Sequence, residues 1–222
     1  MRIQTIFFDL DDTLYLPSCG VWPLIRDRIC LYMNERLSIP WEEIPPLRRK
    51  LFEQYGTTGR GLKALYDIDE EEYLVYVHDV PIEDHIRPDS TLREMILALV
   101  QRRLIFTNAS RAHAERVIAA LGLDGCFEQI IDIAQIAPTC KPQPEAYQRA
   151  LTLSGEADAS RCLVIDDSPF NLAAAQSIGF QALLVLDDGR EAPDHFYRIH
   201  RIQDLPQALS QISEDQHARR PE

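Results

Sequence analysis

Apolar and polar residues follow different patterns in different parts of the chain. The first strand-like apolar run is Ile3–Asp9, after which residues 16–88 carry apolar side chains only at helical spacing. Residues 89–212 instead alternate short apolar runs, typical of buried strands, with segments of helical spacing. Alternation of this kind predicts an α/β fold in which helices cover both faces of a parallel sheet.

The same pattern predicts how the chain is divided. We expect a core domain made of residues 1–15 and 89–212, a helical domain of residues 16–88 inserted into it, and a polar, frayed tail at 213–222. The segment Asp79–Asp89 contains two prolines and is expected to be a linker. Strands are predicted at 3–9, 103–106, 129–133, 162–165 and 182–186, and helices at 21–37, 41–55, 61–66, 70–76, 90–101, 110–121, 144–153, 169–178 and 205–212.

The helical block is inserted directly after the first strand. It therefore lies at the carboxyl end of that strand, where ligands bind in open α/β sheets. This position suits a cap that covers a binding site. An interaction domain without a part in chemistry is the alternative.

Three carboxylates follow the first strand within four residues. They lie in Asp9-Leu10-Asp11-Asp12-Thr13. Side chains alternate along a strand, so Asp9 and Asp11 are expected to point the same way. Two like charges at that distance repel unless a divalent cation or a shared proton intervenes. A polar turn in which Asp12 or Thr13 caps a helix is the alternative.

Three later segments bring further polar groups to strand ends. Thr107-Asn108 ends one strand and can hold phosphate oxygens or simply cap a helix. Lys141 lies between a cysteine and a proline, which restrains it, although a lone lysine is usually a solvated charge. Asp166-Asp167 repeats the opening pattern of an apolar strand followed by paired acids. Carboxylates from two strand ends of one sheet suit Mg²⁺.

Charge and cysteine content limit the possible partners. A net charge of −12 argues against a nucleic-acid polymer or an anionic membrane as the ligand, but not against a small anionic substrate. The five cysteines are scattered without a C-x-x-C spacing, which argues against zinc or dithiol chemistry. No leader-like or membrane-spanning apolar run is apparent, so a cytoplasmic location is expected.

Taken together, these segments resemble the haloacid dehalogenase-like hydrolase superfamily. Its four motifs occur in the expected order and on the expected elements, so the resemblance covers essentially the whole chain. It implies a Rossmann-like core with a small helical cap inserted after the first strand. Dehalogenase members lack a second acid at the position of Asp11, so its presence favours phosphoryl transfer. The matching positions are Asp9, Asp11 and Thr13 for the first motif, Thr107 for the second, Lys141 for the third, and Asp166 with Asp167 for the fourth.

A narrower resemblance is to the pyrimidine 5′-nucleotidase subgroup. One departure is Gly59-Arg60, where that subgroup has a hydrophobic and a small residue. The segments that carry the resemblance are 7–15, 55–58 with 61–62, 76–79, and 105–109 followed by His113-Ala114.

The resemblance implies a role for each core residue. Asp9 would attack phosphorus and form an aspartyl-phosphate, while Asp11 would protonate the leaving oxygen and later deprotonate water. Lys141 would offset negative charge, and Thr107 with the Asn108 amide would hold phosphoryl oxygens. The implied Mg²⁺ ligands are Asp9, the main-chain carbonyl of Asp11, and Asp167, with Asp166 binding directly or through water.

The cap is expected to select the leaving group. Candidates to meet a nucleoside are Tyr55, Thr57, Thr58, Arg60 and His78. Each has an ordinary structural alternative: a core tyrosine, two helix-capping threonines, a solvated arginine and a hinge histidine.

The leading hypothesis is a Mg²⁺-dependent phosphatase for nucleoside 5′-monophosphates, pyrimidine ones first. The alternatives are a phosphatase for another small ester, such as a sugar phosphate or phosphoglycolate, a phosphomutase, and a catalytically silent regulatory protein on the same fold. The expected partner is a small phosphate ester.

Overall fold

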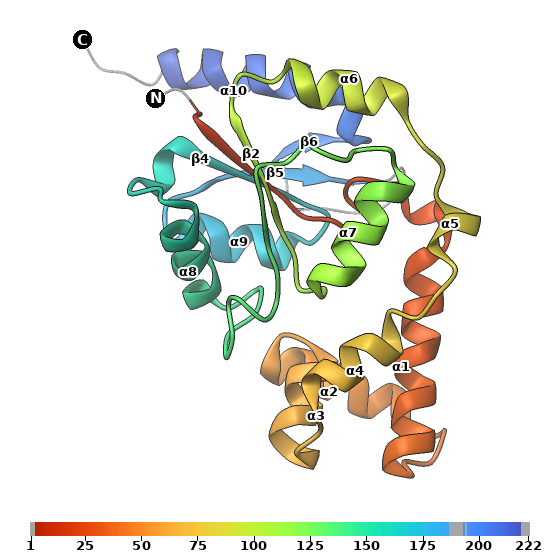
Figure 1. The fold of residues 1–222 in the computed structure, drawn as a ribbon. Coiled ribbons are helices and arrows are strands. Elements are labelled where there is room, and N and C mark those ends of the chain that lie inside the picture. The colour runs from red at the N-terminus through yellow and green to blue at the C-terminus, as the bar shows by residue number, and fades with distance from the viewer. Residues whose placement is uncertain (1–2, 187–192, 194, 219–222) are drawn as a thin grey trace.

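A parallel sheet forms the centre of the molecule. The computed structural model describes residues 3–186, 193 and 195–218, and among these residues six strands form a sheet of order β3-β2-β1-β4-β5-β6 (Figure 1). Every neighbouring pair is parallel, which confirms the predicted α/β fold. The strands are β1 (Thr5–Phe8), β2 (Arg102–Phe106), β3 (Gln129–Ile131), β4 (Cys162–Asp166), β5 (Gln181–Val185) and β6 (Tyr197–Ile199).

The central strand is buried on both of its faces. All four residues of β1 are buried, as expected for a strand in a sheet covered on both sides. Phe7 meets Phe106 and Phe180 edge to face, with ring centroids 6.3 and 5.5 Å apart, whereas Phe8 meets Phe127 at 5.6 Å in the other layer. These aromatic contacts fix β1 between two separate apolar layers.

Helices cover both faces of the sheet. One layer contains buried residues of α8 (Pro144–Ser154) and α9 (Pro169–Ser177), and the other contains buried residues of α6 (Ser90–Ala98), α7 (Arg111–Ala120) and α10 (Leu205–Ala218) (Figure 1). Short 3₁₀ helices lie at Pro17–Cys19, Ala159–Arg161 and Ile202–Asp204. None of the helices in the described part of the chain is both long and apolar enough to cross a bilayer.

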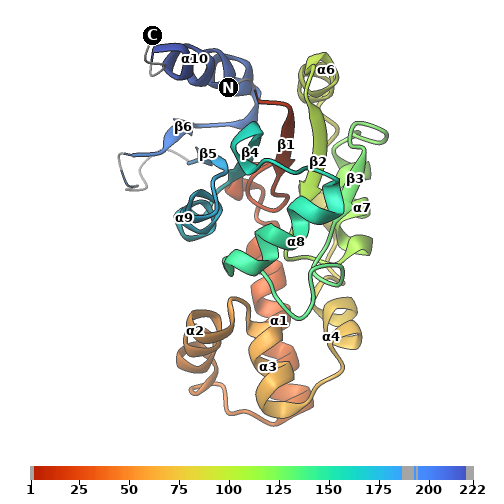
Figure 2. The same cartoon turned by 90° about the vertical axis from the view of Figure 1, so that its left-hand side faces the viewer.

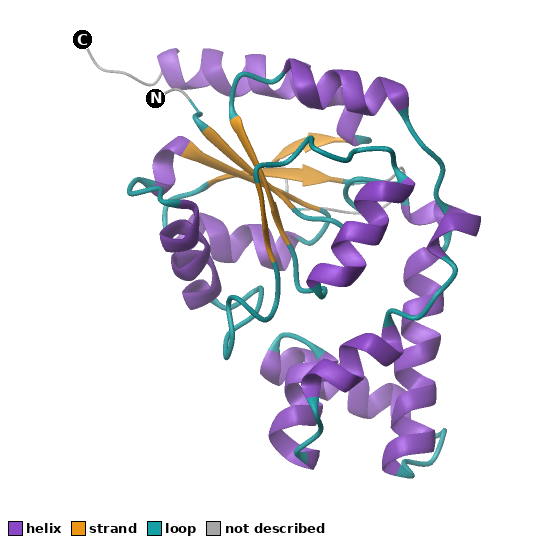
Figure 3. Ribbon diagram, in the orientation of Figure 1, coloured by secondary structure: helices purple, strands orange, loops and turns teal. Residues whose placement is uncertain are grey.

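A group of helices without strands separates β1 from β2. It lies beyond the end of the sheet to which β1 points (Figure 2, Figure 3). Buried residues of α1 and α4 belong to the same apolar cluster as Phe8 and Leu14, so this group is packed onto the core. The exact domain boundaries stay a prediction. The helices are α1 (Val21–Leu37), α2 (Ile44–Tyr55), α3 (Thr58–Tyr66), α4 (Glu70–Val77) and α5 (Ile82–His85).

Three local predictions need correction. The expected linker contains α5, because Pro81 stands just before the helix, where a missing N–H costs no hydrogen bond. The last helix runs beyond 212 to Ala218, since residues 213–218 contain neither glycine nor proline; the expected frayed tail otherwise falls on 219–222, outside the described residues. The edge strand β6 was missed because only three residues form it and one of them is exposed.

Candidate active site

Three neighbouring strands deliver polar residues to one edge of the sheet. Phe8, the last residue of β1, is paired with Ile105 on β2 and Ile165 on β4. Asp9 directly follows β1, Thr107 directly follows β2, and Asp166 is the last residue of β4, so all three lie at the same edge of the sheet. These segments meet, as the sequence predicts, because the strands are parallel and their carboxyl ends lie at one edge of the sheet.

Lys141 occupies the centre of this group. Its Nζ donates hydrogen bonds to Asp9 Oδ1 at 2.6 Å and Asp166 Oδ2 at 2.8 Å, and only 2% of its side chain is exposed. Although burial alone lowers the pKa of Lys141, the carboxylates of Asp166 and Asp9 raise it above its ordinary value. The lysine is therefore a fixed positive charge between two buried acids.

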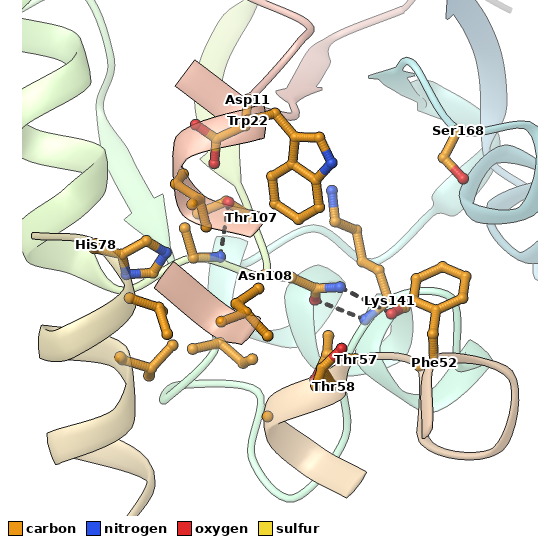
Figure 4. Close-up of a pocket in the computed structure, with 18 of the residues that line it drawn as sticks. Asp11, Trp22, Phe52, Thr57, Thr58, His78, Thr107, Asn108, Lys141 and Ser168 are labelled. Atoms are coloured by element: carbon orange, nitrogen blue, oxygen red, sulfur yellow. Dashed lines mark hydrogen bonds between the residues drawn. The ribbon is translucent and has the colours of Figure 1, made fainter. Parts of the chain in front are cut away.

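The main chain of Lys141 is held as firmly as its ammonium group. Its N–H donates to Asn108 Oδ1 and its carbonyl accepts from Asn108 Nδ2, both at 2.9 Å (Figure 4). This reciprocal pair joins the loop that follows β2 to the loop that precedes α8. Asn108, predicted to bind phosphate through its amide N–H, thus uses its side chain to place Lys141.

The acids at this edge carry more negative charge than Lys141 can offset. Burial, opposed by Lys141 and reinforced by Asp166, raises the pKa of Asp9 to about 7. Burial together with the charges of Asp9 and Asp166 raises the pKa of Asp167 to about 8. Crowded carboxylates of this kind are stabilised as anions by a cation among them.

A donor set for a hard cation is present. Asp9, Asp166 and Asp167 each offer one carboxylate oxygen, and these oxygens lie within 4.8 Å of one another. Such a set of oxygens suits Mg²⁺, which binds through a few carboxylates and keeps several waters. The residues present therefore fit the metal that the sequence predicts.

Asp166 differs from the other two acids. It is completely buried, and its oxygens accept hydrogen bonds from the Ser168 main chain at 2.9 Å, from Asn171 Nδ2 at 2.9 and 3.0 Å, and from Lys141. Asp167 is partly exposed and lines the cavity described below. The geometry therefore gives Asp166 the task of holding Lys141 and the start of α9.

Asp11 is held by two donors that meet one oxygen. Its Oδ1 accepts from Tyr15 Oη at 2.6 Å and faces His113 Nε2 at 2.8 Å. Burial alone raises the pKa of Asp11, but His113 and Tyr15 more than offset it, so that the pKa is lowered. The carboxylate of Asp11 is therefore favoured as an anion.

A cavity of about 560 Å³ opens over these residues. The core contributes Asp9, Asp11, Thr107, Asn108, Lys141 and Asp167 to its wall. The cap contributes the opposite wall, in which Trp22, Phe52, Thr57, Thr58 and His78 face the core residues (Figure 4). The volume is in the range of ordinary small-molecule sites.

Two predicted cap contacts do not lie on the cavity. Tyr55 is half-buried and packs against the main apolar cluster. The Arg60 guanidinium pairs with Glu70 and donates to the main-chain carbonyls of Ile133 at 2.8 Å and Thr139 at 3.2 Å. Arg60 thus connects the cap to core loops near Lys141, because its side chain reaches past the cavity wall.

The sequence prediction gave no role to several residues that shape the site. His113 was named only as part of the subgroup resemblance, and Asn171 was not named. They stand near the starts of α7 and α9 and hold Asp11 and Asp166, respectively. Trp22 and Phe52 line the cavity with 44% and 50% of their surface exposed. The signal that could have identified them is the presence of large aromatic residues on helices of the cap.

Comparison with known proteins identifies a matching family and a curated relative. A model of the haloacid dehalogenase-like hydrolase family matches residues 3–179. Phosphate metabolism protein 8 of Saccharomyces cerevisiae is 29% identical over an alignment of 190 positions, which covers 79% of this chain and 59% of that protein. The chain thus spans about three-fifths of the length of this curated relative.

Solved structures of similar fold include hydrolases with different reactions. The HAD-hydrolase YfnB from Bacillus subtilis, bound to magnesium, gives a TM-score of 0.64 at 18% identity and covers 95% of this chain and 100% of its own. A HAD phosphatase from Thermococcus onnurineus gives 0.59 at 16%, covering 93% and 98%. The L-2-haloacid dehalogenase from Xanthobacter autotrophicus gives 0.58 at 15%, covering 94% and 99%. At these identities the likeness shows the fold alone.

Proposed function

The chain belongs to the haloacid dehalogenase-like hydrolase family, and we propose that it is a Mg²⁺-dependent phosphomonoesterase. The observation that carries the proposal is the pair Asp9 and Asp11 on one cavity, where Lys141 is bonded to the first acid. A dehalogenase needs only the first of these acids, whereas ester hydrolysis also needs a group that exchanges protons with the leaving oxygen and with water.

The proposed reaction has two steps on Asp9. Without substrate Asp11 is favoured as a carboxylate, but the negative charge of a bound phosphate ester would raise its pKa and favour uptake of a proton from solvent. In the first step, an Asp9 oxygen bonds to phosphorus, the bond from phosphorus to the ester oxygen breaks, and Asp11 gives that oxygen its proton. In the second, water attacks phosphorus of the aspartyl-phosphate and Asp11 takes the water's proton. The bond from phosphorus to Asp9 breaks, which releases phosphate and returns Asp9 to its carboxylate form. One acid therefore serves both steps without a net change in its protonation.

The surrounding residues would bind and orient the phosphoryl group. Thr107 Oγ1 already accepts a hydrogen bond from the Ala109 N–H at 3.0 Å, so its own hydrogen is available for a phosphoryl oxygen. Lys141 offsets the charge that Asp9 and the phosphoryl group bring together. Mg²⁺ bound by Asp9, Asp167 and the main-chain carbonyl of Asp11 would supply further shielding of that charge.

The roles of the two neighbouring acids predict unequal effects on metal binding. Asp167→Ala should raise the Mg²⁺ concentration for half-maximal activity more than Asp166→Ala, because Asp166 is already engaged by Asn171 and Lys141. Replacing a residue that hydrogen-bonds to a metal's ligand typically lowers the metal affinity by about 10-fold to 100-fold, and loss of a direct ligand should exceed this. Mg²⁺ titrations of activity compare the two variants. The reverse order would exchange the two assignments.

For the substrate, we propose a nucleoside 5′-monophosphate, with pyrimidine bases preferred. The support is the resemblance of the cap segments and the two aromatic side chains, Trp22 and Phe52, whose exposed surfaces line the cavity. Flat bases stack on such surfaces. Sugar phosphates and phosphoglycolate have no flat aromatic ring that could stack on these surfaces.

A substrate panel tests this choice. The protein should hydrolyse UMP and CMP with higher kcat/KM than AMP and GMP, and 5′-phosphates better than 3′-phosphates. Trp22→Ala and Phe52→Ala should each lower kcat/KM for UMP by about tenfold or more, since stacking on one base is worth roughly 1–3 kcal/mol, while para-nitrophenyl phosphate is affected less. Leu65→Ala, at an exposed cap residue that does not line the cavity, is the control. Equal efficiency on purine and pyrimidine nucleotides would remove the pyrimidine assignment, and a preference for a sugar phosphate would remove the nucleotide assignment altogether.

A further inference from the structure

Within the described part of the chain, the donors that hold the Asp11 side chain meet one of its two oxygens. The Tyr15 hydroxyl and His113 Nε2 both meet Oδ1, at 2.6 and 2.8 Å. Neither of these bonds involves Oδ2, and Asp11 lines the cavity with 17% of its side chain exposed. An oxygen that exchanges a proton with bound substrate has to face the cavity, and two donors on the other oxygen leave Oδ2 for that purpose.

His113 is itself held in place from several sides. It is 1% exposed and lies in the first turn of α7, where its N–H donates to Ser110 Oγ at 3.3 Å. Its ring stacks on His78 with centroids 4.3 Å apart and 22° between the planes. His78 Nδ1 in turn lies 3.2 Å from Ser110 Oγ. The imidazole therefore has one orientation, in which Nε2 points at Asp11.

The ring's second nitrogen identifies the tautomer. His113 Nδ1 is buried and has no hydrogen-bond partner among the described residues. A hydrogen on Nδ1 would be a buried donor without an acceptor, which is costly. The hydrogen is therefore placed on Nε2, where the carboxylate of Asp11 accepts it. His113 thus acts as a hydrogen-bond donor with a fixed direction.

We propose that His113 is a positioning residue for the hydrolysis: its Nε2–H holds Asp11 Oδ1 so that Oδ2 faces the ester oxygen and then the attacking water. The proposal rests on the phosphomonoesterase function proposed above. Tyr15 supplies the second donor on the same oxygen, but it lies only four residues from Asp11, whereas His113 is contributed by a helix 102 residues away. His113 therefore fixes the Asp11 side chain relative to α7, a part of the core that is distant in sequence.

The proposal predicts that a misplaced Asp11 affects esters with poor leaving groups more than esters with good ones. An alkoxide leaving group needs a proton from Asp11, whereas para-nitrophenolate leaves with little help. The ratio kcat/KM reports the steps up to departure of the leaving group. Misplacing Asp11 should therefore lower kcat/KM for benzyl phosphate much more than for para-nitrophenyl phosphate, which has a ring of similar size. A loss of packing alone would lower both ratios equally.

The test compares His113→Leu with His113→Gln at saturating Mg²⁺. Leucine removes the donor, and glutamine keeps an N–H at a similar distance along the side chain. With benzyl phosphate, His113→Leu should lose about 10²-fold in kcat/KM, the order expected for a reacting group displaced by about 1 Å. The loss with para-nitrophenyl phosphate should be less than tenfold, and His113→Gln should recover most of the activity on both.

Two controls complete the experiment. His85→Leu also removes a ring-nitrogen hydrogen bond, to the Cys19 carbonyl, but lies outside the cavity and should leave both ratios unchanged. Thermal unfolding of each variant measures any loss of stability separately. An active wild-type protein whose His113→Leu variant keeps both ratios, or loses both equally, would overturn this proposal alone. A wild-type protein inactive on both esters with Mg²⁺ would overturn the proposed function and this proposal with it.

Discussion

Replacing Asp9 by asparagine should lower kcat by on the order of 10⁴-fold or more, the range found when a nucleophile or its partner is removed. The amide is nearly the same size as the carboxylate, and its oxygen can still accept from Lys141, which lies 2.6 Å from Asp9 Oδ1. The Thr13 hydroxyl, 3.0 Å from Oδ2, can rotate to accept a hydrogen bond from the amide. The fold should therefore survive while the nucleophile is lost.

The measurement is phosphate release by the purified variant, with thermal unfolding as the check on folding. Asp132→Asn is the matched control, because Asp132 is also a buried acid after a strand of the sheet but does not line the cavity. In wild-type protein quenched with acid during turnover, mass spectrometry should find phosphate on the peptide that contains Asp9. Substantial phosphatase activity of pure Asp9→Asn protein would refute covalent catalysis by this residue.

Lys141→Met should destabilise the fold by about 3–5 kcal/mol, the cost of leaving buried charges without their partner. Methionine fills a similar volume, but Asp9 and Asp166 lose the ammonium group that neutralises them. Hydrolysis should also be abolished, since the nucleophile would lose its fixed counter-charge. Urea unfolding with a metal chelator present measures the free energy of unfolding without a cation that could take the place of the lysine.

Two comparisons sharpen this prediction. Lys63→Met removes an exposed lysine whose ion pair with Asp67 spans 3.8 Å, and it should cost less than about 1 kcal/mol. Adding Asp166→Asn to Lys141→Met should restore part of the stability, because one uncompensated charge is removed. The proposed charge balance predicts a loss of about 3–5 kcal/mol in the free energy of unfolding. A Lys141→Met protein whose free energy of unfolding lies within about 1 kcal/mol of the wild-type value would contradict it.

The stability deficit of Lys141→Met should also depend on pH. The pKa of Asp9 is about 7 with the lysine present, and removal of the lysine raises it further. A carboxyl group whose pKa is higher in the folded state than in the unfolded chain favours the fold at low pH, and this contribution is lost as pH rises through the folded-state pKa. The deficit should therefore be smallest in acid and grow through neutral pH.

The sequence was sufficient for those parts of the fold and site that follow from strand order. Apolar runs such as Ile6–Phe8 and Leu163–Ile165 identify strands buried on both faces, and parallel pairing then brings Asp9 and Asp166 together. The pattern failed at β6, which is short and lies at the edge, where only part of the strand is buried.

Contacts made by packing could not be predicted in this way. The bond between His113 and Asp11 depends on how α7 crosses the end of β1, over a separation of 102 residues. The contacts of Arg60 with Ile133 and Thr139 depend on how the cap docks onto loops more than 70 residues away. A single sequence shows that each residue is polar, but it does not show which partner lies within reach.

The Arg60 contacts bear on how quickly molecules can enter and leave. Both carbonyl acceptors belong to core loops, and Thr139 stands two residues before Lys141. Hydrogen bonds to a charged donor are worth about 1.5–3 kcal/mol each, so separating α3 from these loops carries a considerable energetic barrier. The residence time of a product under the cap is therefore expected to depend on an arginine that does not touch it, with a release rate that rises steeply on warming.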